Sequence, residues 1–519
     1  MSEIMNVELL IALPFIGAFL VAFLPATGSR LLSLLVTLAT LSVAGNIFAT
    51  FDGTNSADFT LNIPWMNDLG VNLHLAVDGL NLYLLLLTTL IFAVVLVCSW
   101  TTAACRRPLF LTLLLFLEAG LVGTFLSQNL ILFFIFWEAV LIPMFIMILV
   151  FGGAKSKSAA FTFFLYTLAG SVLLLAAIIL LGVVSWQQTG VWSFEYNDIL
   201  NLQLNWEMQL FVFTAIVLAC AIKCPLFPLH SWLPLAYSES PAAGTAIMAG
   251  ALSKMGAFAL IKLAVPLCPQ VAVFAAPWLL VWAVISILYG AIMALRQTDI
   301  KLLVAYSSLS HMGYIVLGVF SFYETALHGA LFQTFSHGLA VGGLFLLLGL
   351  LEQRLGDDYK NVTALSTAAP RFAVLLLLFI LTSIALPLTS GFTGEFMILL
   401  GAFQKAFALW QGQAGATSLV AVLFACSGIV LGAGYMLRFA RKILYGKSRQ
   451  EMILPDLGLR ETLVFVPLLF LILWVGIAPA GYMAKVQPAV TFVAERVDST
   501  PASIDLSLAT VLHGDANGR

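Results

Sequence analysis

Residues 221–254 read AIKCPLFPLHSWLPLAYSESPAAGTAIMAGALSK, and this stretch indicates the architecture of the whole chain. Lys223 lies in an apolar run and is followed at once by Pro225 and Pro228. Lys254 lies in the middle of the next apolar run. An ionisable group at membrane depth costs about 2.5–3.5 kcal/mol on insertion scales, so each lysine is a functional candidate. The prolines indicate an interrupted helix, which a bilayer tolerates only where protein or water covers the freed backbone groups.

The composition indicates a polytopic membrane protein. Of 519 residues, 61% are hydrophobic and only 9% are charged, whereas a soluble domain carries about 25% charged residues. The lipid bilayer is therefore the expected surrounding of the chain. The net charge of −2 gives no reason to expect nucleic acid as a partner, and the six cysteines show no metal-type spacing.

The expected fold is all-α, with about fourteen transmembrane helices. Each apolar run is long enough for a hydrocarbon core about 30 Å thick. The expected spans are 5–25, 32–50, 80–100, 109–126, 130–151, 160–184, 209–228, 242–265, 272–295, 301–320, 326–351, 372–404, 418–440 and 462–482. Between spans two and three, the polar stretch 51–78 has the composition of a small surface hairpin.

The basic residues predict the orientation. Loops after odd-numbered spans carry most of them: Arg30, Arg106, Arg107, Lys155, Lys157, Arg296, Lys301, Arg354, Lys360, Arg371, Arg438, Arg441, Lys442, Lys447, Arg449 and Arg460. Loops after even-numbered spans hold almost none beyond Lys405. The positive-inside rule then places both termini on the non-cytoplasmic side.

Two expected spans carry a charge beside a helix break. Span seven has Lys223 beside Pro225, and span twelve has Glu395 beside Pro387 and Gly391, 172 residues after Lys223. The two spans run in opposite directions through the membrane. Paired interrupted helices in corresponding halves of a chain indicate an inverted-repeat transporter.

Titratable residues recur at similar depth on several spans. Six of them form the expected relay: Glu138, Lys223, Lys254, His311, His337 and Glu395. A proton relay needs groups whose pKa can be moved toward neutrality, and buried Lys, Glu and His are such groups. Glu138 and Lys223 are the natural pair for a charge-controlled proton switch. His230 and Glu239, which follow span seven, are candidates for proton uptake or release at the cytoplasmic end.

Each of these residues also has a purely structural interpretation. The carboxylates and Lys223 can form ion pairs that lock helices together, and the histidines can hydrogen-bond neighbouring helices. Lys262, near the end of span eight, is expected to extend to the interface, and Asp78 to cap span three.

No GxGxxG, Walker A or CxxC pattern occurs in a suitable context. We therefore expect no cofactor and no metal in this chain.

Several stretches resemble the antiporter-like subunits of respiratory complex I, and most closely the M-type chain, the counterpart of mitochondrial chain four. They are VDGLN at 77–81, FFIFWEAVLIPM at 133–144, AIKCPLFPLHSWLP at 221–234, LSKMGAFALIK at 252–262, LLVAYSSLSHMGY at 302–314, FQTFSHGL at 332–339 and GFTGEFMIL at 391–399. These stretches follow the family order over about 320 residues. A glutamate at 395, where L- and N-type chains have lysine, indicates the M type.

The resemblance implies two inverted five-helix repeats. The expected organisation is 1–108 for helices one to three, 109–265 for the first half-channel, 266–440 for the second, 441–485 for a loop and helix fourteen, and 486–519 for a polar tail on the surface or disordered. It also implies roles: Glu138 and Lys223 as the coupled pair, Lys254 as the connecting lysine, His311 and His337 as intermediate carriers, and Glu395 as the terminal group.

The same resemblance implies the surroundings of the chain. Its partners would be other antiporter-like subunits and small membrane subunits of a complex I-type assembly. Flavin, iron–sulfur clusters and quinone would belong to partner subunits, which take electrons from NAD(P)H or ferredoxin. The expected location is an energy-coupling membrane, either the bacterial inner membrane or one of thylakoid type.

One departure from the family pattern follows SWLP. The family usually continues with Asp-Ala-His, whereas this chain has Leu235, Ala236 and Tyr237, so two titratable groups are missing near the cytoplasmic exit. A divergent paralogue is one interpretation. The competing functions are a subunit of a Mrp-type cation/proton antiporter and a scaffold paralogue that no longer pumps; the intact line of six titratable groups argues against the scaffold.

Overall fold

The computed structural model describes residues 5–53, 56–412, 416–446 and 454–499. The first half comprises α1 (Met5–Phe23), α2 (Ala26–Thr50), β1 (Thr60–Met66), β2 (Val71–Ala76), α3 (Leu82–Cys98), α4 (Pro108–Leu126), α5 (Leu130–Ala139), α6 (Leu141–Phe151), α7 (Ser156–Thr189), α8 (Tyr196–Leu200), α9 (Trp206–Lys223), α10 (Trp232–Glu239), α11 (Ala242–Ile247), α12 (Lys254–Ala259) and α13 (Val265–Leu267). The second half comprises α14 (Pro269–Arg296), α15 (Ile300–Phe320), α16 (Glu324–Leu355), α17 (Leu365–Ala368), α18 (Pro370–Ser383), α19 (Ser390–Gln411), α20 (Thr417–Tyr445), α21 (Leu459–Ile477) and α22 (Ala480–Asp498).

The expected all-α membrane fold is confirmed. Among the described residues, thirteen helices are long and apolar enough to cross a membrane, and two shorter apolar helices cover Val7–Phe23 and Pro370–Ser383. Each of the fourteen expected spans coincides with one of these helices or with an interrupted pair. The interruptions expected in spans seven and twelve separate α9 from α10 and α18 from α19.

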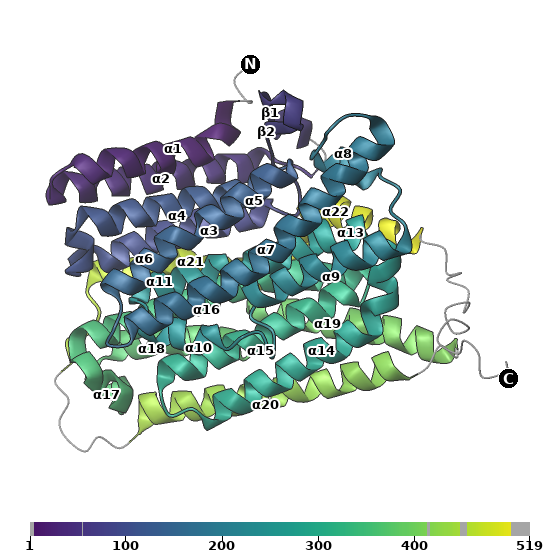
Figure 1. The fold of residues 1–519 in the computed structure, drawn as a ribbon. Coiled ribbons are helices and arrows are strands. Elements are labelled where there is room, and N and C mark those ends of the chain that lie inside the picture. The colour runs from purple at the N-terminus through teal and green to yellow at the C-terminus, as the bar shows by residue number, and fades with distance from the viewer. Residues whose placement is uncertain (1–4, 54–55, 413–415, 447–453, 500–519) are drawn as a thin grey trace.

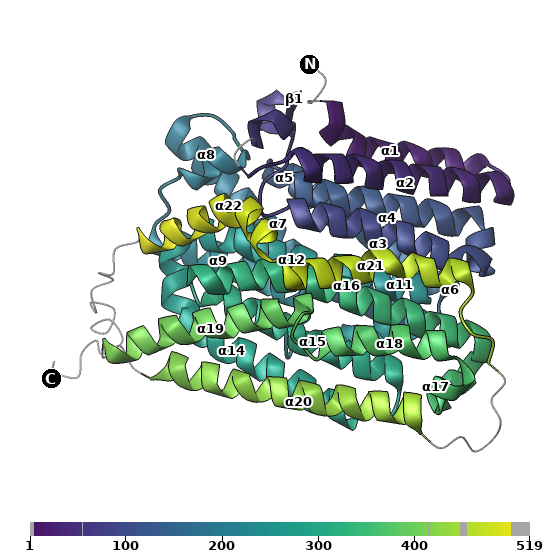
Figure 2. The ribbon, with the colours of Figure 1, turned by 180° about the vertical axis from the view of Figure 1, so that it is seen from behind.

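The long helices lie side by side in one bundle (Figures 1 and 2). α1 and α2 form one edge and α20 forms the opposite edge. The apolar windows of the discontinuous helix Ala242–Leu267 and of α16 are completely surrounded by protein. These two inner helices carry Lys254 and His337, so the bundle places both groups away from lipid.

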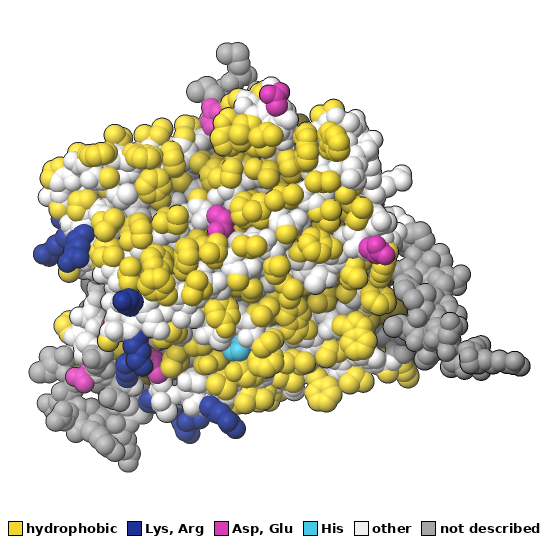
Figure 3. Space-filling view, in the orientation of Figure 1, with side chains coloured by type: hydrophobic (Ala, Val, Ile, Leu, Met, Phe, Trp, Pro, Cys, Tyr) yellow, Lys and Arg dark blue, Asp and Glu magenta, His cyan; other side chains and the backbone are white. Residues whose placement is uncertain are grey.

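Charge is concentrated at one end of the bundle. Figure 3 shows hydrophobic side chains over the flank and Lys and Arg side chains gathered at the left end. Loops after odd-numbered spans contact one another there: Arg107 lies over the Phe151 ring at 5.9 Å, and the backbone N–H of Lys155 donates to Glu239 Oε2 at 2.7 Å. We call this the basic end. The loops that the sequence assigned to one side of the membrane therefore lie together.

The polar stretch 51–78 forms the expected hairpin. β1 pairs with β2 in antiparallel register, from Thr60 opposite Ala76 to Met66 opposite Val71. Gly70 closes the turn with a φ of 67°, a left-handed conformation that glycine adopts without steric cost. The hairpin lies at the end of the bundle opposite the basic end (Figure 1).

The expected polar tail at 486–519 requires a correction. Residues up to Asp498 continue as the amphipathic helix α22, and residues 500–519 lie outside the described part of the chain. Four valines at helical spacing are buried along one face, namely Val486, Val490, Val493 and Val497. Lys485 donates to the carbonyl of Phe48 at 2.8 Å. The overall composition of this segment is polar, but its apolar residues recur with a period near 3.6 residues. In a helix they therefore form one apolar face that packs against the protein.

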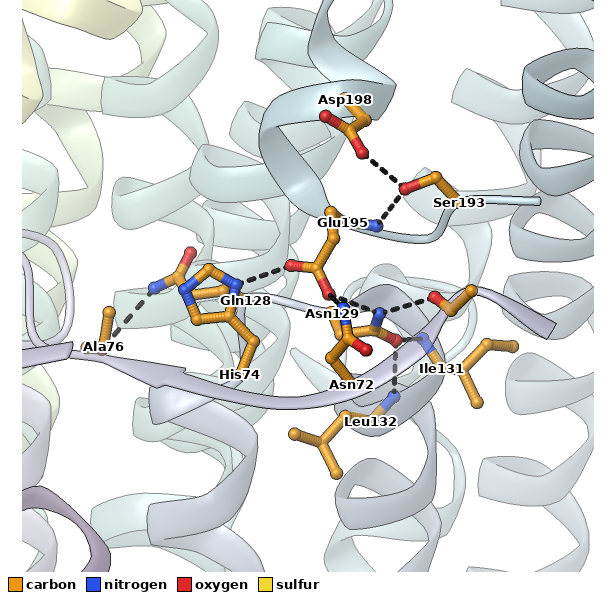
Figure 4. A network of polar contacts seen from close by, with 11 residues as sticks. Asn72, His74, Ala76, Gln128, Asn129, Ile131, Leu132, Ser193, Glu195 and Asp198 are labelled. Atoms are coloured by element: carbon orange, nitrogen blue, oxygen red, sulfur yellow. Dashed lines mark hydrogen bonds and ion pairs between the residues drawn. The ribbon is translucent and has the colours of Figure 1, made fainter. Parts of the chain in front are cut away.

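A polar network ties the hairpin to the membrane helices. Figure 4 shows Glu195 at its centre, between β2 and the first turn of α5. His74 Nδ1 lies 2.5 Å from Glu195 Oε2, while the side-chain amides of Asn72 and Asn129 donate to Oε1 at 3.0 and 2.9 Å. Asn129 also caps α5, because its side chain accepts from the backbone N–H groups of Ile131 and Leu132. The network therefore holds the start of the helix that carries Glu138.

We expect this network to weaken at acid pH. Burial raises the pKa of Glu195, but the hydrogen bonds from His74, Asn129 and Asn72 outweigh it and hold the pKa below its ordinary value of 4.5. The stabilisation is therefore complete above pH 4.5 and is lost as the pH falls through the lower pKa of the folded state. Amide hydrogen exchange at 60–76 should accelerate over that range. Glu195→Gln should remove the pH dependence and cost about 1–3 kcal/mol locally, whereas Asp198→Asn should leave the profile unchanged.

Candidate functional site

Lys254 and His337 form the centre of a buried polar chain. Lys254 is completely buried, and its Nζ lies 2.6 Å from His337 Nδ1, 2.6 Å from the Ala249 carbonyl oxygen and 3.1 Å from Ser253 Oγ. Three partners satisfy the three N–H groups of an ammonium. A neutral amine fits equally well if it accepts from a protonated Nδ1. The site therefore accommodates both protonation states without moving a helix.

The backbone around Lys254 has an unusual local form. Two π-helical segments, Met248–Leu252 and Leu260–Ala264, flank α12. The Ser253 N–H bonds the carbonyl of Met248, five residues earlier, at 3.0 Å. Such widened turns leave carbonyl groups outside the regular ladder and occur frequently at functional sites. Here the Ala249 carbonyl is the one that Lys254 engages.

The second half of the chain supplies His311 and Glu395. His311 Nδ1 lies 2.7 Å from Glu395 Oε1, and the side-chain amide of Gln333 donates to the same oxygen at 3.1 Å. All three side chains are buried, and Glu395 is only 4% exposed. The carboxylate therefore has directed donors on two helices, α15 and α16.

The two imidazoles face the gap between these pairs. Their ring centroids lie 5.4 Å apart, and the Nε2 atoms of both His311 and His337 are buried without a hydrogen-bond partner in the described part of the chain. If Lys254 donates to His337 Nδ1, neutral His337 carries its proton on Nε2. Because the Glu395 carboxylate accepts from His311 Nδ1, neutral His311 carries its proton on Nδ1. One Nε2 is then a donor and the other an acceptor. This is the complementarity that a proton transfer requires.

Close packing of α19 against α16 brings Glu395 to His311 and Gln333. α19 begins after the break at residues 384–389, and its Gly394 lies against α16. A Cβ atom at Gly394 would lie 2.5 Å from Gln333 Oε1 and 3.0 Å from Gln333 Cα. Glycine at this position therefore allows α19 to approach α16 closely enough for Glu395 to reach Gln333 and His311.

Lys223 and Glu138 are near one another but not in contact. Lys223 Nζ donates to the Trp137 carbonyl at 3.5 Å and lies 4.7 Å from the centroid of the Trp137 ring. No ion pair within 4.0 Å joins it to Glu138 among the described residues, and Glu138 Oε1 is buried without a partner. The expected coupling of this pair therefore stays a prediction, and the observed contact of Lys223 is with Trp137, the residue that precedes Glu138.

The Lys223 region joins the Lys254 region through their neighbours in sequence. Cys224 Sγ lies 3.6 Å from the carbonyl oxygen of Ser253. A Cβ at Gly256 would lie 2.6 Å from Cys224 Sγ, so the end of α9 packs directly on α12. The structure thus brings four predicted residues into one chain, from Lys254 to Glu395. It places Lys223 and Glu138 beside that chain without a direct hydrogen bond to it.

A hollow at the basic end reaches the break after α9. It has a volume of about 670 Å³ and is lined by His230, Leu235, Glu239, Tyr289, Tyr306 and Glu352 among others. His230 is 6% exposed and its Nδ1 has no partner in the described chain. Glu239 lines the hollow while it binds the backbone of Lys155. Both uptake candidates therefore lie where water from the basic end can reach them.

Leu235 and Tyr237 have different surroundings. Leu235 lines the hollow, as expected for a residue at the exit. Tyr237 is completely buried, with its ring beside Trp232 and Phe345. Its hydroxyl is directed at Ser253 and Ser308 but makes no hydrogen bond within the described residues. The departure from the family pattern thus removes a polar group at the surface and places a hydroxyl near Lys254.

Two further observations differ from expectation. Lys262 is 2% exposed and pairs with Asp78 at 3.2 Å, so it is held inside the protein instead of extending to the interface. Asp78 accepts from the backbone N–H groups of Leu80 and Asn81, just before α3.

Sequence reasoning also missed Glu118, which is completely buried in α4. A carboxylate in the middle of LTLLLFLEAGLVG was the signal that could have found it.

Comparison with known proteins gives the family. Residues 127–424 match the model of the family described as NADH:quinone oxidoreductase/Mrp antiporter, transmembrane. NADH-quinone oxidoreductase subunit M of Escherichia coli K12 is 34% identical over 490 residues, which cover 91% of this chain and 94% of that protein. The chain belongs to the NADH:quinone oxidoreductase/Mrp antiporter family. The predicted resemblance to the M-type chain is confirmed.

Two solved structures agree with the fold. A chain of respiratory complex I from Thermus thermophilus with bound NADH has a TM-score of 0.84 and 31% identity, over 95% of this chain and 99% of that chain. A chain of the Mrp complex from Dietzia sp. DQ12-45-1b has a TM-score of 0.79 but 19% identity, over 96% and 98%. The second likeness shows the fold alone. This family member is thus a multi-pass subunit of a multisubunit membrane complex.

Proposed function

We propose that this chain is the proton-translocating M-type subunit in the membrane arm of a complex I-type oxidoreductase. The observation that carries the proposal is the buried series of side chains Lys254, His337, His311 and Glu395, which runs from α12 through α16 and α15 to α19. Electron transfer from NAD(P)H or ferredoxin to quinone takes place in partner subunits, which hold the flavin and iron–sulfur groups. This chain contributes the proton path.

The geometry supports a stepwise transfer. Lys254 releases a proton to His337 Nδ1, and the proton on His337 Nε2 passes to His311 Nε2, directly after a ring rotation or through one water. His311 then gives its Nδ1 proton to Glu395. Each step exchanges one N–H or O–H bond for another, and the neutral tautomers of both imidazoles are reset when their rings or protons return. A charge at Glu138 controls the readiness of Lys223 to hold or release its own proton.

The proposed orientation follows the charge distribution. The basic end faces the cytoplasm, and the hairpin β1–β2, α22 and both termini face the opposite side. Two inverted repeats, 109–265 and 266–440, each contribute one interrupted helix. The flanks then contact lipid and the neighbouring antiporter-like and small membrane subunits. The higher identity to the complex I chain than to the Mrp chain favours proton translocation by an oxidoreductase over cation/proton antiport.

The test is the complex assembled with Lys223→Ala in sealed membrane vesicles. We expect quinone reduction and proton translocation to fall together, by at least about tenfold, since positioned proton-transfer groups contribute about 10²–10⁴-fold. The surface variant Lys442→Ala is the matched control, and the amount of chain in the purified complex reports folding. Wild-type rates of both processes in Lys223→Ala would refute the proposal. Sodium-dependent transport without an electron donor would instead favour the antiporter.

A further inference from the structure

Glu118 is a buried carboxyl group that the relay from Lys254 to Glu395 does not use. It lies ten residues after the first residue of α4, about 15 Å along the helix and close to the middle of a bilayer about 30 Å thick. Its side chain is completely buried. Neither Oε1 nor Oε2 has a hydrogen-bond partner, and no cation pairs with it, within the described ranges of the chain.

A structural role does not account for this group. Buried carboxyl groups that stabilise a fold are hydrogen-bonded or ion-paired, because an unpaired one costs several kcal/mol. Thr124 on the same helix illustrates the usual solution, since its hydroxyl donates to the Gly120 carbonyl at 2.8 Å. Glu118 makes no such bond. An ionisable group kept without partners at membrane depth indicates a function in proton or ion transfer.

Helix periodicity shows which face of α4 carries Glu118. Positions 118 and 125 are seven residues apart and lie within about 20° of each other around the helix axis. Phe125 packs edge-to-face on Phe258 of α12 at 5.3 Å, and its carbonyl accepts from Asn81 at the start of α3. Glu118 therefore lies on the face of α4 that packs toward the inner helix carrying Lys254.

The depth of Glu118 matches that of Lys254. Both α4 and α11–α12 start at the basic end and run in the same direction, with Phe125 level with Phe258. Glu118 lies seven residues before Phe125, and Lys254 lies four residues before Phe258. The difference in level is therefore about 4.5 Å along the bundle axis, with Glu118 nearer the basic end.

A second hollow lies at the basic end, where α3 ends and α4 and α11 begin. It has a volume of about 300 Å³ and is lined by the end of α3, the start of α4 and the start of α11, including Ser99, Phe110, Ser240 and Ala242. Ser240 is 2% exposed, and its hydroxyl has no partner in the described chain, so it offers a site for water. Phe110 at the hollow lies eight residues before Glu118, about 12 Å along α4.

We propose that Glu118 carries protons on a second uptake route, which runs from this hollow between α3, α4 and α11 to Lys254. The hollow adjoins the one at His230, since Gly153, Ser238, Glu239 and Glu352 line both, but the route leaves it on the α4 side. A proton from the hollow reaches the Glu118 carboxylate through water, and the resulting carboxylic acid gives its O–H proton to a water that passes one of its own protons to the neutral amine of Lys254. This inference rests on the proposed function, because it supplies the relay that begins at Lys254.

The test compares Glu118→Gln, Glu118→Leu and Glu118→Asp in the assembled complex in sealed vesicles. We expect Gln and Leu to slow proton uptake and quinone reduction by about tenfold, and Asp to retain most of the rate. Infrared difference spectra during turnover should lose one protonated-carboxyl band in Glu118→Gln. Thr124→Val, which removes a buried hydroxyl from the same helix, is the matched control and should behave as wild type.

Each outcome separates the two proposals. If Glu118→Gln keeps the wild-type rate and the infrared band persists, the second route is refuted. If Glu118→Gln is active and only Glu118→Leu fails, the residue is structural and the inference is equally wrong. If Lys223→Ala stops translocation while Glu118→Gln does not, the proposed function stands and only this route is lost. If Lys223→Ala leaves translocation intact, the proposed function itself has failed.

Discussion

Replacing Lys254 with methionine is expected to abolish proton-coupled quinone reduction while leaving the chain folded and assembled. Lys254 connects the first half of the bundle to His337 and His311 in the second half. Methionine has no proton to give, and no other side chain among the described residues forms a hydrogen bond with His337 Nδ1. A positioned proton-transfer group contributes about 10²–10⁴-fold, and a water bypass reduces that loss, so we expect a fall of at least about tenfold.

The fold should tolerate this change because two effects oppose each other. His337 and the Ala249 carbonyl each lose a partner, which costs about 1–3 kcal/mol per group. Methionine also removes the desolvation cost of a buried amine that has no carboxylate within ion-pair distance in the described chain. The thermal midpoint of the purified complex should therefore change little.

Lys262→Met is the matched control for Lys254→Met. Lys262 lies two turns further along the same discontinuous helix, is also buried, and pairs with Asp78. Its loss leaves the carboxylate of Asp78 half-buried and unpaired, so stability should fall by more than in Lys254→Met. Proton translocation per electron should nevertheless stay at the wild-type ratio. Equal losses of activity in both variants would show that a generic buried lysine, and no relay through His337, explains the effect.

Glu395→Gln is expected to stop translocation at the far end of the chain. The amide has nearly the same shape, and its oxygen still accepts from His311 Nδ1 and from Gln333. It has no carboxylate to take the proton, so His311 keeps it and the chain cannot reload. We expect proton translocation and coupled quinone reduction to decrease at least about tenfold, measured in the same sealed vesicles.

Two further variants sharpen this prediction. Glu395→Asp keeps the carboxylate but shortens the reach to His311, so a partial rate is expected. Glu461→Gln removes a carboxylate in the first turn of α21 that pairs with Arg354 in the last turn of α16 at 2.7 Å, and should leave the rate unchanged. A fully active Glu395→Gln complex with an unchanged proton-to-electron ratio would contradict the assignment of Glu395 as the terminal group.

Local patterns predicted much of this architecture. Hydropathy located the spans because the bilayer demands long apolar helices wherever the chain crosses it. Proline and glycine located the two breaks, since these residues disrupt the helix within a few positions of themselves. The amphipathic character of α22 was missed because its apolar stripe is narrow and its overall composition is polar. The burial of Lys262 was missed because its partner Asp78 lies 184 residues away in sequence.

The six titratable groups were predicted by residue type and depth, yet their contacts were not. Lys254 meets His337 across 83 residues, and His311 meets Glu395 across 84. Such contacts depend on the rotation of each helix and on close approaches such as that of Gly394 to Gln333. Sequence also suggested a Glu138–Lys223 pair, whereas packing places Trp137 against Lys223.

By itself, then, the sequence determined that this is a multi-pass membrane protein with two broken helices and a set of charges at the depth of the membrane. These properties are local, because transfer free energy and backbone disruption are set by residues close together in the chain. Only the tertiary structure decided which charges touch, which imidazole nitrogens lack a partner in the described part of the chain, and that Glu118 is buried there without a partner. These properties are non-local, because helix packing sets the distances between side chains, and proton transfer depends on those distances.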